Sequence, residues 1–282
     1  IKYFKYSHQI SENDPAYILY VKLKGALNKI DFAASAHYKV YNQDNNYLYY
    51  SLKNQIDDWI KQKKSTGFNS LQNWMYDNKG SNVVVVAQTG AGKTEASELW
   101  IGNNQGIITE PLKSADNSIY NRIKNMFCRN YYNHVGLLHS DSSRNLLNEY
   151  SDYDDYKLIN SEIKNYSLPL IITTLDNLFT TAFKYKGYES KMVTLANSNT
   201  VIDEIQMYSP DVLSYLLYNL KEIVKFGGHF TIVTATLAPF VTDLMKEIGL
   251  KFKQPEPFLL DNLQNRHYVK VKNNYLNCKD II

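Results

Sequence analysis

The stretch Val83-Val84-Val85-Val86-Ala87-Gln88-Thr89-Gly90-Ala91-Gly92-Lys93-Thr94 decides the fold. Its valines form a continuous apolar run, which is typical of a short strand buried on both faces. Gly90 and Gly92 permit a backbone turn in which successive N–H groups point at one centre. Lys93 and Thr94 then open a helix, whose N-terminus carries a partial positive charge. The pattern predicts a strand–loop–helix unit that binds phosphate groups.

The same loop predicts a site for ATP with magnesium. Lys93 places a compact cation on the outer phosphates, and the Thr94 hydroxyl is suited to ligate the metal. The backbone that cradles the phosphates belongs to the residues before Lys93, namely Gln88, Thr89, Gly90, Ala91 and Gly92. A glycine-rich turn formed by chance is the alternative interpretation, and the flanking strand and helix argue against it.

A second apolar strand ends in two adjacent acids, at Val201-Ile202-Asp203-Glu204. We expect Asp203 to hold magnesium through water, and Glu204 to orient or deprotonate the attacking water. Glu204 and Lys93 are therefore the candidate catalytic residues. An acid pair at a strand end is often simply solvated, so this interpretation depends on the pair lying on a strand near the phosphate loop.

Short apolar runs alternate with helical stretches from Val83 onward. Strands are expected at 83–86, 106–109, 135–138, 170–173, 200–202 and 230–233, and helices at 113–127, 175–183, 210–224 and 239–248. This alternation predicts an α/β fold, a RecA-like P-loop domain with a parallel central sheet. Ligands of such sheets bind at the carboxyl ends of the strands. We interpret the polar, acid-rich residues 140–166 as a surface insertion.

The chain before this domain is predicted to be helical. Asp14 followed by Pro15 indicates a helix start, and a second helix is expected at 47–64. The predicted organisation has three parts: a small helical segment at 1–66, the RecA-like domain at 67–264, and the start of a linker or of a second RecA-like domain at 265–282.

Composition limits the classes of function. The chain has 31 Lys and Arg against 28 Asp and Glu, so its charge balance alone does not indicate a nucleic-acid binder, and any such contact must be local. Cys128 and Cys278 form no metal-binding pattern and are typical of a reducing compartment, so we expect a cytoplasmic protein. No run of about 18 apolar residues exists, so we expect no membrane association.

The order of several short motifs resembles superfamily 2 helicases. Asp203-Glu204-Ile205-Gln206 resembles their motif II, and Thr234-Ala235-Thr236 resembles motif III, which couples ATP hydrolysis to the handling of nucleic acid. The resemblance implies coupling roles for Gln206, Thr234 and Thr236. Gln72 resembles the upstream glutamine that reads the adenine edge, since an amide can pair with both adenine N6 and N7.

Two further segments resemble the nucleic-acid motifs of the same superfamily. Glu110-Pro111-Leu112 with Arg122 resembles motif Ia, and Ile172-Thr173-Thr174-Leu175-Asp176 resembles motif Ib. The resemblance implies that Pro111, Arg122, Thr173 and Thr174 contact the phosphate backbone of a single strand.

The chain more closely resembles the CRISPR-associated helicase–nuclease of type I systems. Leu137-Leu138-His139-Ser140 and residues 173–178 resemble stretches of that family, and residues 23–36 resemble the end of its HD nuclease domain. The resemblance implies a motor that moves along and unwinds single-stranded or R-loop DNA, with single-stranded DNA and a guide-RNA surveillance complex as partners. It also implies that Asp31 is the last metal ligand of the HD site.

The sequence differs from that family at several positions, and these differences limit which functions the resemblance implies for this chain. The family usually has His or Asp where this chain has Gln206, which leaves the coupling to motif III open. His8 and His37 do not form the His-Asp pair of an HD domain, and Asp31 alone cannot hold a transition metal. We therefore predict no nuclease activity in this chain, and Asp31 can equally be a helix-surface acid.

The later helicase motifs are missing, although residues 265–269 resemble the entry to a second RecA-like domain. That domain would supply an arginine finger. The chain alone is therefore expected to bind ATP, to hydrolyse it slowly and not to unwind DNA. Two other interpretations stay open: another superfamily 2 motor, such as a restriction-type translocase or an RNA helicase, and a nucleotide-binding scaffold that never hydrolyses ATP.

Overall fold

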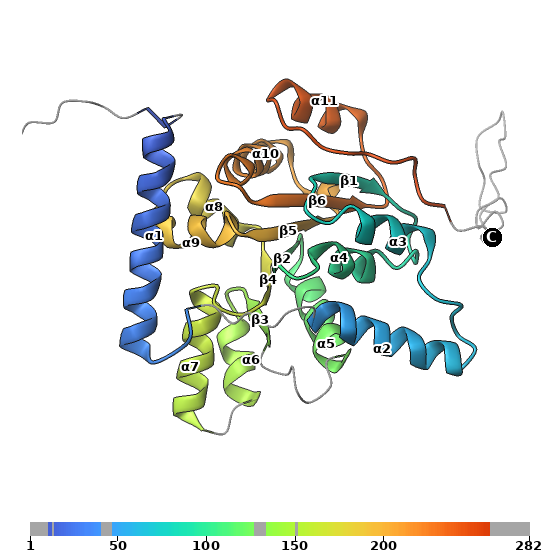
Figure 1. The fold of residues 1–282 in the computed structure, drawn as a ribbon, viewed down its shortest axis with the longest axis horizontal. Coiled ribbons are helices and arrows are strands. Elements are labelled where there is room, and N and C mark those ends of the chain that lie inside the picture. Colours follow the sequence, from blue (N-terminus) through green and yellow to red (C-terminus); the bar gives the residue numbers. More distant parts are fainter. Residues whose placement is uncertain (1–10, 13, 41–46, 127–133, 150–151, 260–282) are drawn as a thin grey trace, which may run out of the picture.

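The computed structural model describes residues 11–12, 14–40, 47–126, 134–149 and 152–259. Its centre is a six-stranded sheet in the order β1-β6-β5-β2-β4-β3, and every neighbouring pair is parallel (Figure 1). The strands are β1 (Val83–Val86), β2 (Gln105–Glu110), β3 (Val135–Leu138), β4 (Leu170–Thr174), β5 (Ser198–Asp203) and β6 (His229–Thr234). The predicted α/β fold with a parallel central sheet is confirmed.

Strand side chains alternate between two hydrophobic clusters, one on each face of the sheet. Val84 of β1 and Ile202 of β5 belong to one cluster, whereas Val83 and Val85 of β1 and Val201 of β5 belong to the other. Because both faces are covered, neither face of a strand needs polar side chains. This explains why the strands read as continuous apolar runs.

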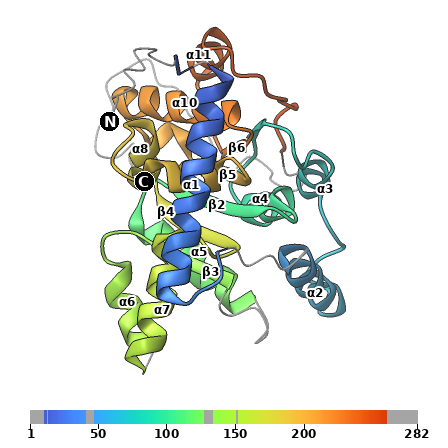
Figure 2. The same ribbon diagram turned by 60° about the vertical axis from the view of Figure 1, so that its left-hand side comes forward.

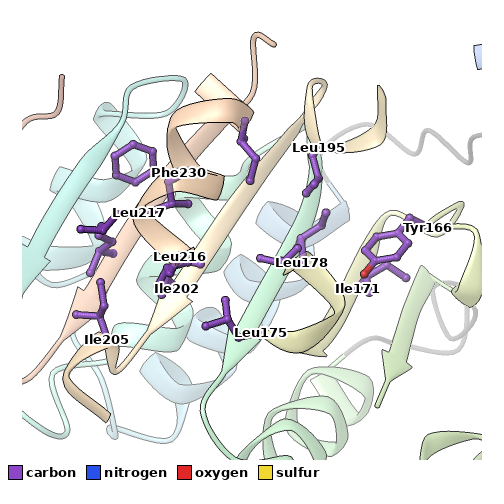
Figure 3. Packing of buried hydrophobic residues seen from close by; sticks show 14 of the residues in the cluster. Tyr166, Ile171, Leu175, Leu178, Leu195, Ile202, Ile205, Leu216, Leu217 and Phe230 are labelled. Atoms are coloured by element: carbon purple, nitrogen blue, oxygen red, sulfur yellow. The ribbon is translucent and has the colours of Figure 1, made fainter. Parts of the chain in front are cut away.

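The first face is covered by helices from the second half of the chain. They are α6 (Ser142–Glu149), α7 (Tyr153–Lys164), α8 (Asp176–Ala182), α9 (Tyr188–Leu195), α10 (Pro210–Lys225) and α11 (Pro239–Glu247). Helix α10 presents apolar residues at helical spacing, with Leu213, Leu216, Leu217 and Leu220 buried. Figure 3 shows Leu216 and Leu217 beside Ile202 and Phe230 of the sheet in this cluster.

The second face is covered by helices that precede or follow the phosphate loop. They are α2 (Tyr47–Lys61), α3 (Ser70–Asp77), α4 (Lys93–Ile101) and α5 (Lys113–Met126). Trp100 of α4 is fully buried in this cluster, and its indole N–H donates to the Ser81 carbonyl at 3.1 Å. Helix α4, which begins at the phosphate loop, is therefore held firmly against the sheet.

The segment after α11 runs along the outer edge of β1. Val84 N–H donates to the Lys253 carbonyl, and Phe258 N–H donates to the Val86 carbonyl, both at 2.9 Å. The segment then reaches the phosphate loop, where Gln88 N–H donates to the Phe258 carbonyl at 3.0 Å. The edge strand is thus covered, and the first residues of the loop are restrained from two sides.

Helix α1 (Pro15–Ala36) begins as the sequence predicts and packs along α9 at one flank of the molecule (Figures 1 and 2). The Asp14 side chain accepts a hydrogen bond from Ala16 N–H at 2.8 Å. The approach of the two helices is close at Gly25, where an added Cβ would lie 2.2 Å from the Glu189 carbonyl oxygen. Lys24 also pairs with the Glu189 carboxylate at 2.6 Å.

The interpretation of residues 140–166 as a surface insertion is corrected by the structure. Helices α6 and α7 occupy this stretch, and Ile159 and Ile163 of α7 are buried in the core cluster. The Asp152 side chain accepts from Asp154 N–H at the start of α7, where acids also favour the positive helix end. The acidic composition therefore marks a helix start.

Several predicted features lie outside the described residues. They are His8, both cysteines, and the whole of the linker or second domain expected at 265–282. Within the part of the chain that the structure describes, no helix is long and apolar enough to cross a membrane.

The α1–α9 contact leads to a prediction for Gly25→Ala. In a helix interior this change alone would stabilise by about 1 kcal/mol. The added methyl group would collide with backbone at Glu189, and such overpacking costs about 1–3 kcal/mol. We expect a net loss of stability in urea unfolding followed by circular dichroism.

Ser35→Ala, on the exposed face of the same helix, is the control, and it should leave stability unchanged or raise it by about 0.5 kcal/mol. A Gly25→Ala protein that is more stable than the wild type would show that α1 does not pack closely on α9.

Candidate nucleotide-binding site

The phosphate loop joins β1 to α4 at the carboxyl edge of the sheet. Gly90 and Gly92 adopt left-handed backbone angles, with φ of 86° and 77°. Ala91 N–H donates to the Gln88 carbonyl at 3.0 Å, which closes the turn. Ala87 N–H donates to the Thr234 carbonyl at 2.9 Å, so the loop is also attached to β6. The glycines are therefore required where the sequence predicts the turn.

The predicted lysine and acid of the two motifs meet in the structure. Lys93 Nζ lies 2.5 Å from Glu204 Oε1, and their side chains are 11% and 28% exposed. The sheet order explains the contact, because β6 lies between β1 and β5 and their carboxyl ends share one edge. Burial opposes ionisation of Glu204, but hydrogen bonds from Gln206 and Lys93 outweigh it, so the pKa of Glu204 lies below its ordinary value. The carboxylate is therefore ionised at neutral pH.

Glu204 is also the centre of a hydrogen-bond network that includes the predicted coupling residues. Its Oε2 accepts from Gln206 Nε2 at 2.5 Å, from the Thr234 hydroxyl at 3.2 Å and from Ala235 N–H at 3.3 Å. The Thr234 hydroxyl also contacts Gln206 Oε1 and lies 2.8 Å from the Thr236 carbonyl. One hydroxyl carries one proton, so Thr234 donates to only one of these acceptors at a time. Gln206 thus connects the two motifs despite departing from the family pattern.

The backbone at Glu204 is held in an unusual conformation. Its φ is 47°, in the left-handed region that a residue with a side chain rarely adopts. Glu204 N–H donates to the Val233 carbonyl at 3.0 Å and to Asp203 Oδ1 at 2.9 Å, and these bonds stabilise the conformation. The turn directs the carboxylate back over β6 toward Lys93. Such conformations cluster at functional sites.

A buried pair of carboxyl groups lies beside this network, and sequence reasoning missed one of its members. Glu110 ends β2, is only 4% exposed and lies beside Asp203 at the end of neighbouring β5. Burial and the adjacent Asp203 charge raise the pKa of Glu110 to about 9. The Glu110 carboxyl group therefore keeps its proton at neutral pH. The signal was the position of Glu110 at a strand end, which becomes informative only when β2 and β5 are known to be neighbours.

The residues expected to hold magnesium suit that ion in their chemistry. Burial and then the Glu204 charge raise the pKa of Asp203, so a cation bound there would favour its ionised form. Thr94 and Asp203 offer the hard oxygen ligands that Mg²⁺ prefers. Within the described ranges no group of at least three His, Cys, Asp or Glu residues is arranged to hold a metal. Water and phosphate oxygens would therefore supply most ligands, as is usual for magnesium bound with a nucleotide.

Gln72 lies against the phosphate loop, where it forms a capping box at the start of α3. Gln72 Oε1 accepts from Asn69 N–H at 3.0 Å, and Asn69 Oδ1 accepts from Gln72 N–H at 2.9 Å. Asn69 Nδ2 also donates to the Ala91 carbonyl at 2.9 Å. Gln72 Nε2 lies 2.7 Å from the position that a Cβ on Gly92 would take. The pair therefore supports the loop, and adenine recognition by Gln72 stays a prediction.

The Thr173 side chain is fully buried, its hydroxyl donates to the Leu138 carbonyl at 2.7 Å, and it accepts from Asn177 Nδ2 at 2.9 Å. These bonds join β4 to β3. A contact of Thr173 with a phosphate would therefore use its backbone, and it stays a prediction.

The other predicted nucleic-acid contacts stay predictions. Pro111 and Thr174 are partly exposed at the carboxyl edge of the sheet. The Arg122 guanidinium pairs with Glu95 of α4 at 3.4 Å, so it lies beside the helix that begins at the phosphate loop. Lys113, at the start of α5 and 49% exposed, is a further cation at this edge that the motif comparison did not single out.

Asp31 lies apart from all of these residues. It is exposed on α1, at the flank where that helix packs on α9. In the described ranges no cluster of potential metal ligands includes it. Its role as an HD-site ligand stays a prediction.

Comparison with known proteins identifies relatives. The model of the DEAD/DEAH box helicase family matches residues 69–244. The CRISPR-associated nuclease/helicase Cas3 of Methanothermobacter thermautotrophicus is 27% identical over 173 residues, which cover 60% of this chain and 21% of that protein. The putative Cas3 of Methanocaldococcus jannaschii is 26% identical over 215 residues, which cover 69% and 29%. The chain spans less than a third of the length of these relatives.

Solved structures show the same fold. Crystal structures of T. fusca Cas3 with ADP and with AMPPNP both give a TM-score of 0.57 at 17% and 16% identity, and the match covers 73% of this chain and 24% of those chains. The shared fold is RecA-like, as the sequence predicts.

The buried carboxyl pair leads to a prediction about pH. Glu110 has a pKa of about 9 in the folded chain against 4.5 as its ordinary value, so the unfolded state loses this proton first. Stability should therefore fall as pH rises through this interval, by at most about 1.4 kcal/mol per unit. Glu110→Gln cannot ionise, so its stability relative to the wild type should increase with pH.

Urea unfolding at about pH 5, 7 and 9 measures this difference. Burial also raises the pKa of Glu98 to about 8 and of Asp116 to about 7. Both groups are present in both proteins, so the difference between them reports Glu110 together with the acids coupled to it, above all Asp203. Glu256→Gln, on the exposed segment after α11, is the control. A difference between Glu110→Gln and wild type that does not change with pH would contradict the raised pKa of Glu110.

Proposed function

Because the chain belongs to the DEAD/DEAH box helicase family, we propose that it is the ATP-binding half of a DNA motor. The motor is the interference helicase of a CRISPR type I system, which uses ATP to move along and unwind single-stranded or R-loop DNA. Residues 67–264 form its first RecA-like domain, and residues 1–66 are the end of an HD nuclease domain. The similarity to Cas3 proteins supports the CRISPR assignment, and the guide-RNA surveillance complex and a cytoplasmic location are part of the same proposal.

The observation that carries the proposal is the Lys93–Glu204 ion pair within the Thr234 network. The triphosphate of ATP competes with Glu204 for the Lys93 ammonium group, because both are anions that pair with a cation. When the lysine turns to the phosphates, Glu204 is released to orient the attacking water. Magnesium, when bound with ATP, neutralises charge on the phosphates, and Thr94 and Asp203 would hold it.

The same exchange of partners at Lys93 would transmit the nucleotide state to the rest of the motor. Glu204 Oε2 accepts from Gln206, Thr234 and Ala235, so a shift of the carboxylate changes which partner the Thr234 hydroxyl selects. The Thr234 carbonyl also accepts a hydrogen bond from Ala87 N–H, which connects Thr234 to the start of the phosphate loop. Nucleotide state would thus alter the turn after β6. A nucleic-acid strand that crosses the carboxyl edge of the sheet near Pro111 and Thr174 would be affected by that change.

The nucleotide site leads to a prediction for Lys93→Met. A charge-assisted hydrogen bond is worth about 1.5–3 kcal/mol, so the affinity for a fluorescent ATP analogue should fall by about tenfold to a hundredfold. Fluorescence titration of the 282-residue chain measures it. Lys61→Met is the control, since Lys61 lies on α2 with a side chain 75% exposed.

The motor itself is tested by ATP turnover with and without single-stranded DNA or RNA, in a protein that continues past residue 282 through a second RecA-like domain. Turnover that depends on Lys93 and is stimulated by single-stranded DNA supports the DNA motor. Stimulation by RNA alone would favour an RNA helicase. Nucleotide binding without any Lys93-dependent turnover would show that the chain is a scaffold.

A further inference from the structure

A cavity of about 410 Å³ lies at the junction of α1 with the sheet domain. Lys29 of α1, Gln105 at the start of β2 and Asn197 after α9 line it, and Ile30 and Val193 provide apolar wall. Its volume is within the ordinary range of small-molecule sites. Gln105 begins the strand that ends at Glu110, so the cavity and the nucleotide site lie at opposite ends of β2.

Lys29 is a buried cation in this cavity, and its polar partners are neutral. The residue is 7% exposed, and its ammonium group donates to the Thr194 hydroxyl at 2.5 Å and to the Tyr166 carbonyl at 3.2 Å. Among the described residues no carboxylate pairs with it. Burial lowers the pKa of Lys29 to about 8. A buried charge is costly unless it is paired. An anion bound in the cavity would therefore stabilise the charged form of Lys29.

A second group in the cavity also lacks a partner. The Gln105 amide nitrogen donates to the Tyr166 and Leu168 carbonyls, both at 2.7 Å, which fixes the orientation of the side chain. Its carbonyl oxygen, Oε1, is buried with no hydrogen bond. A buried acceptor without a donor costs about 1–3 kcal/mol. Lys29 and Gln105 therefore both line the cavity, although the Gln105 oxygen is itself covered.

The surroundings add positive charge. Lys191 of α9 lies 5.5 Å from the centre of the Tyr166 ring, and Tyr166 is the residue whose carbonyl accepts from Lys29. Burial lowers the pKa of Lys191 as well. The nearby Glu189 carboxylate is already paired with Lys24. Lys29 and Lys191 thus both lie near Tyr166, although Lys191 is not among the residues that line the cavity.

We propose that this cavity is a binding site for a small organic anion, whose carboxylate or phosphate pairs with Lys29. The ligand's apolar part lies against Ile30 and Val193. Occupation joins α1 to α9 and β2, so the ligand strengthens the docking of α1 on the sheet domain. The site is separate from the nucleotide site, and the proposal does not depend on the proposed function.

The site is tested by the reactivity of the Lys29 amine toward an acetylating reagent, followed by mass spectrometry of peptides. The protein carries Lys93→Met, which removes the main phosphate contact of the P-loop. The probes are inorganic phosphate, acetate and benzoate, all used at constant ionic strength. The protection of Lys29 by phosphate is compared with its protection by the two carboxylates, which shows which anionic group the cavity prefers. Saturable protection of Lys29 is expected, about tenfold at ten times the dissociation constant. Exposed Lys61 in the same sample should not be protected.

Ala26→Leu is the second variant, because it fills the cavity from α1 with a good helix former and leaves Lys29 in place. It should abolish the protection. Equal protection of Lys29 and Lys61, protection that persists in Ala26→Leu, or no protection of Lys29 by any of the three anions would each overturn the proposal.

Discussion

The ion pair between Lys93 and Glu204 is the contact on which the candidate site depends. It joins the end of the phosphate loop to the end of β5, and β6 lies between the two strands. Two features make the pair possible. The left-handed turns at Gly90 and Gly92 place Lys93 at the first residue of α4, and the left-handed backbone of Glu204 turns its carboxylate back over β6. A parallel sheet with a different strand order would not bring these groups together.

The charges around the pair are arranged so that few remain uncompensated. Lys93 balances Glu204, and Glu110 keeps its proton at neutral pH, so the negative charge that is left over is that of Asp203. This leaves net negative charge near the phosphate loop before a nucleotide arrives. A nucleotide brings further negative charge, which explains why a divalent cation is expected to enter with it. On binding, Lys93 would then exchange Glu204 for the phosphates, and Asp203 would gain the magnesium ion.

The strands and the phosphate loop were predictable because local chemistry determines them. An all-valine run, two glycines and a lysine indicate one strand–loop–helix unit, and the structure contains it. The pairing of Glu110 with Asp203 could not be predicted, because apolar runs do not reveal which strands are neighbours. The acids near Asp152 were misinterpreted since the same composition marks a solvated loop and a helix start. The burial of the Thr173 hydroxyl against β3 could not be predicted either, because a hydroxyl in a motif can serve a phosphate or a neighbouring strand. The helicase family, by contrast, was predictable from the order of the motifs along the chain.

A crystal structure of the chain with magnesium and a non-hydrolysable ATP analogue tests the account most directly. We predict that Lys93 Nζ leaves Glu204 and lies within about 3 Å of phosphate oxygens, while Glu204 keeps its bonds to Gln206 and Ala235. The nucleotide should lie over the turn formed by Gly90 and Gly92. A bound analogue that leaves the Lys93–Glu204 pair intact at its present 2.5 Å would contradict the account.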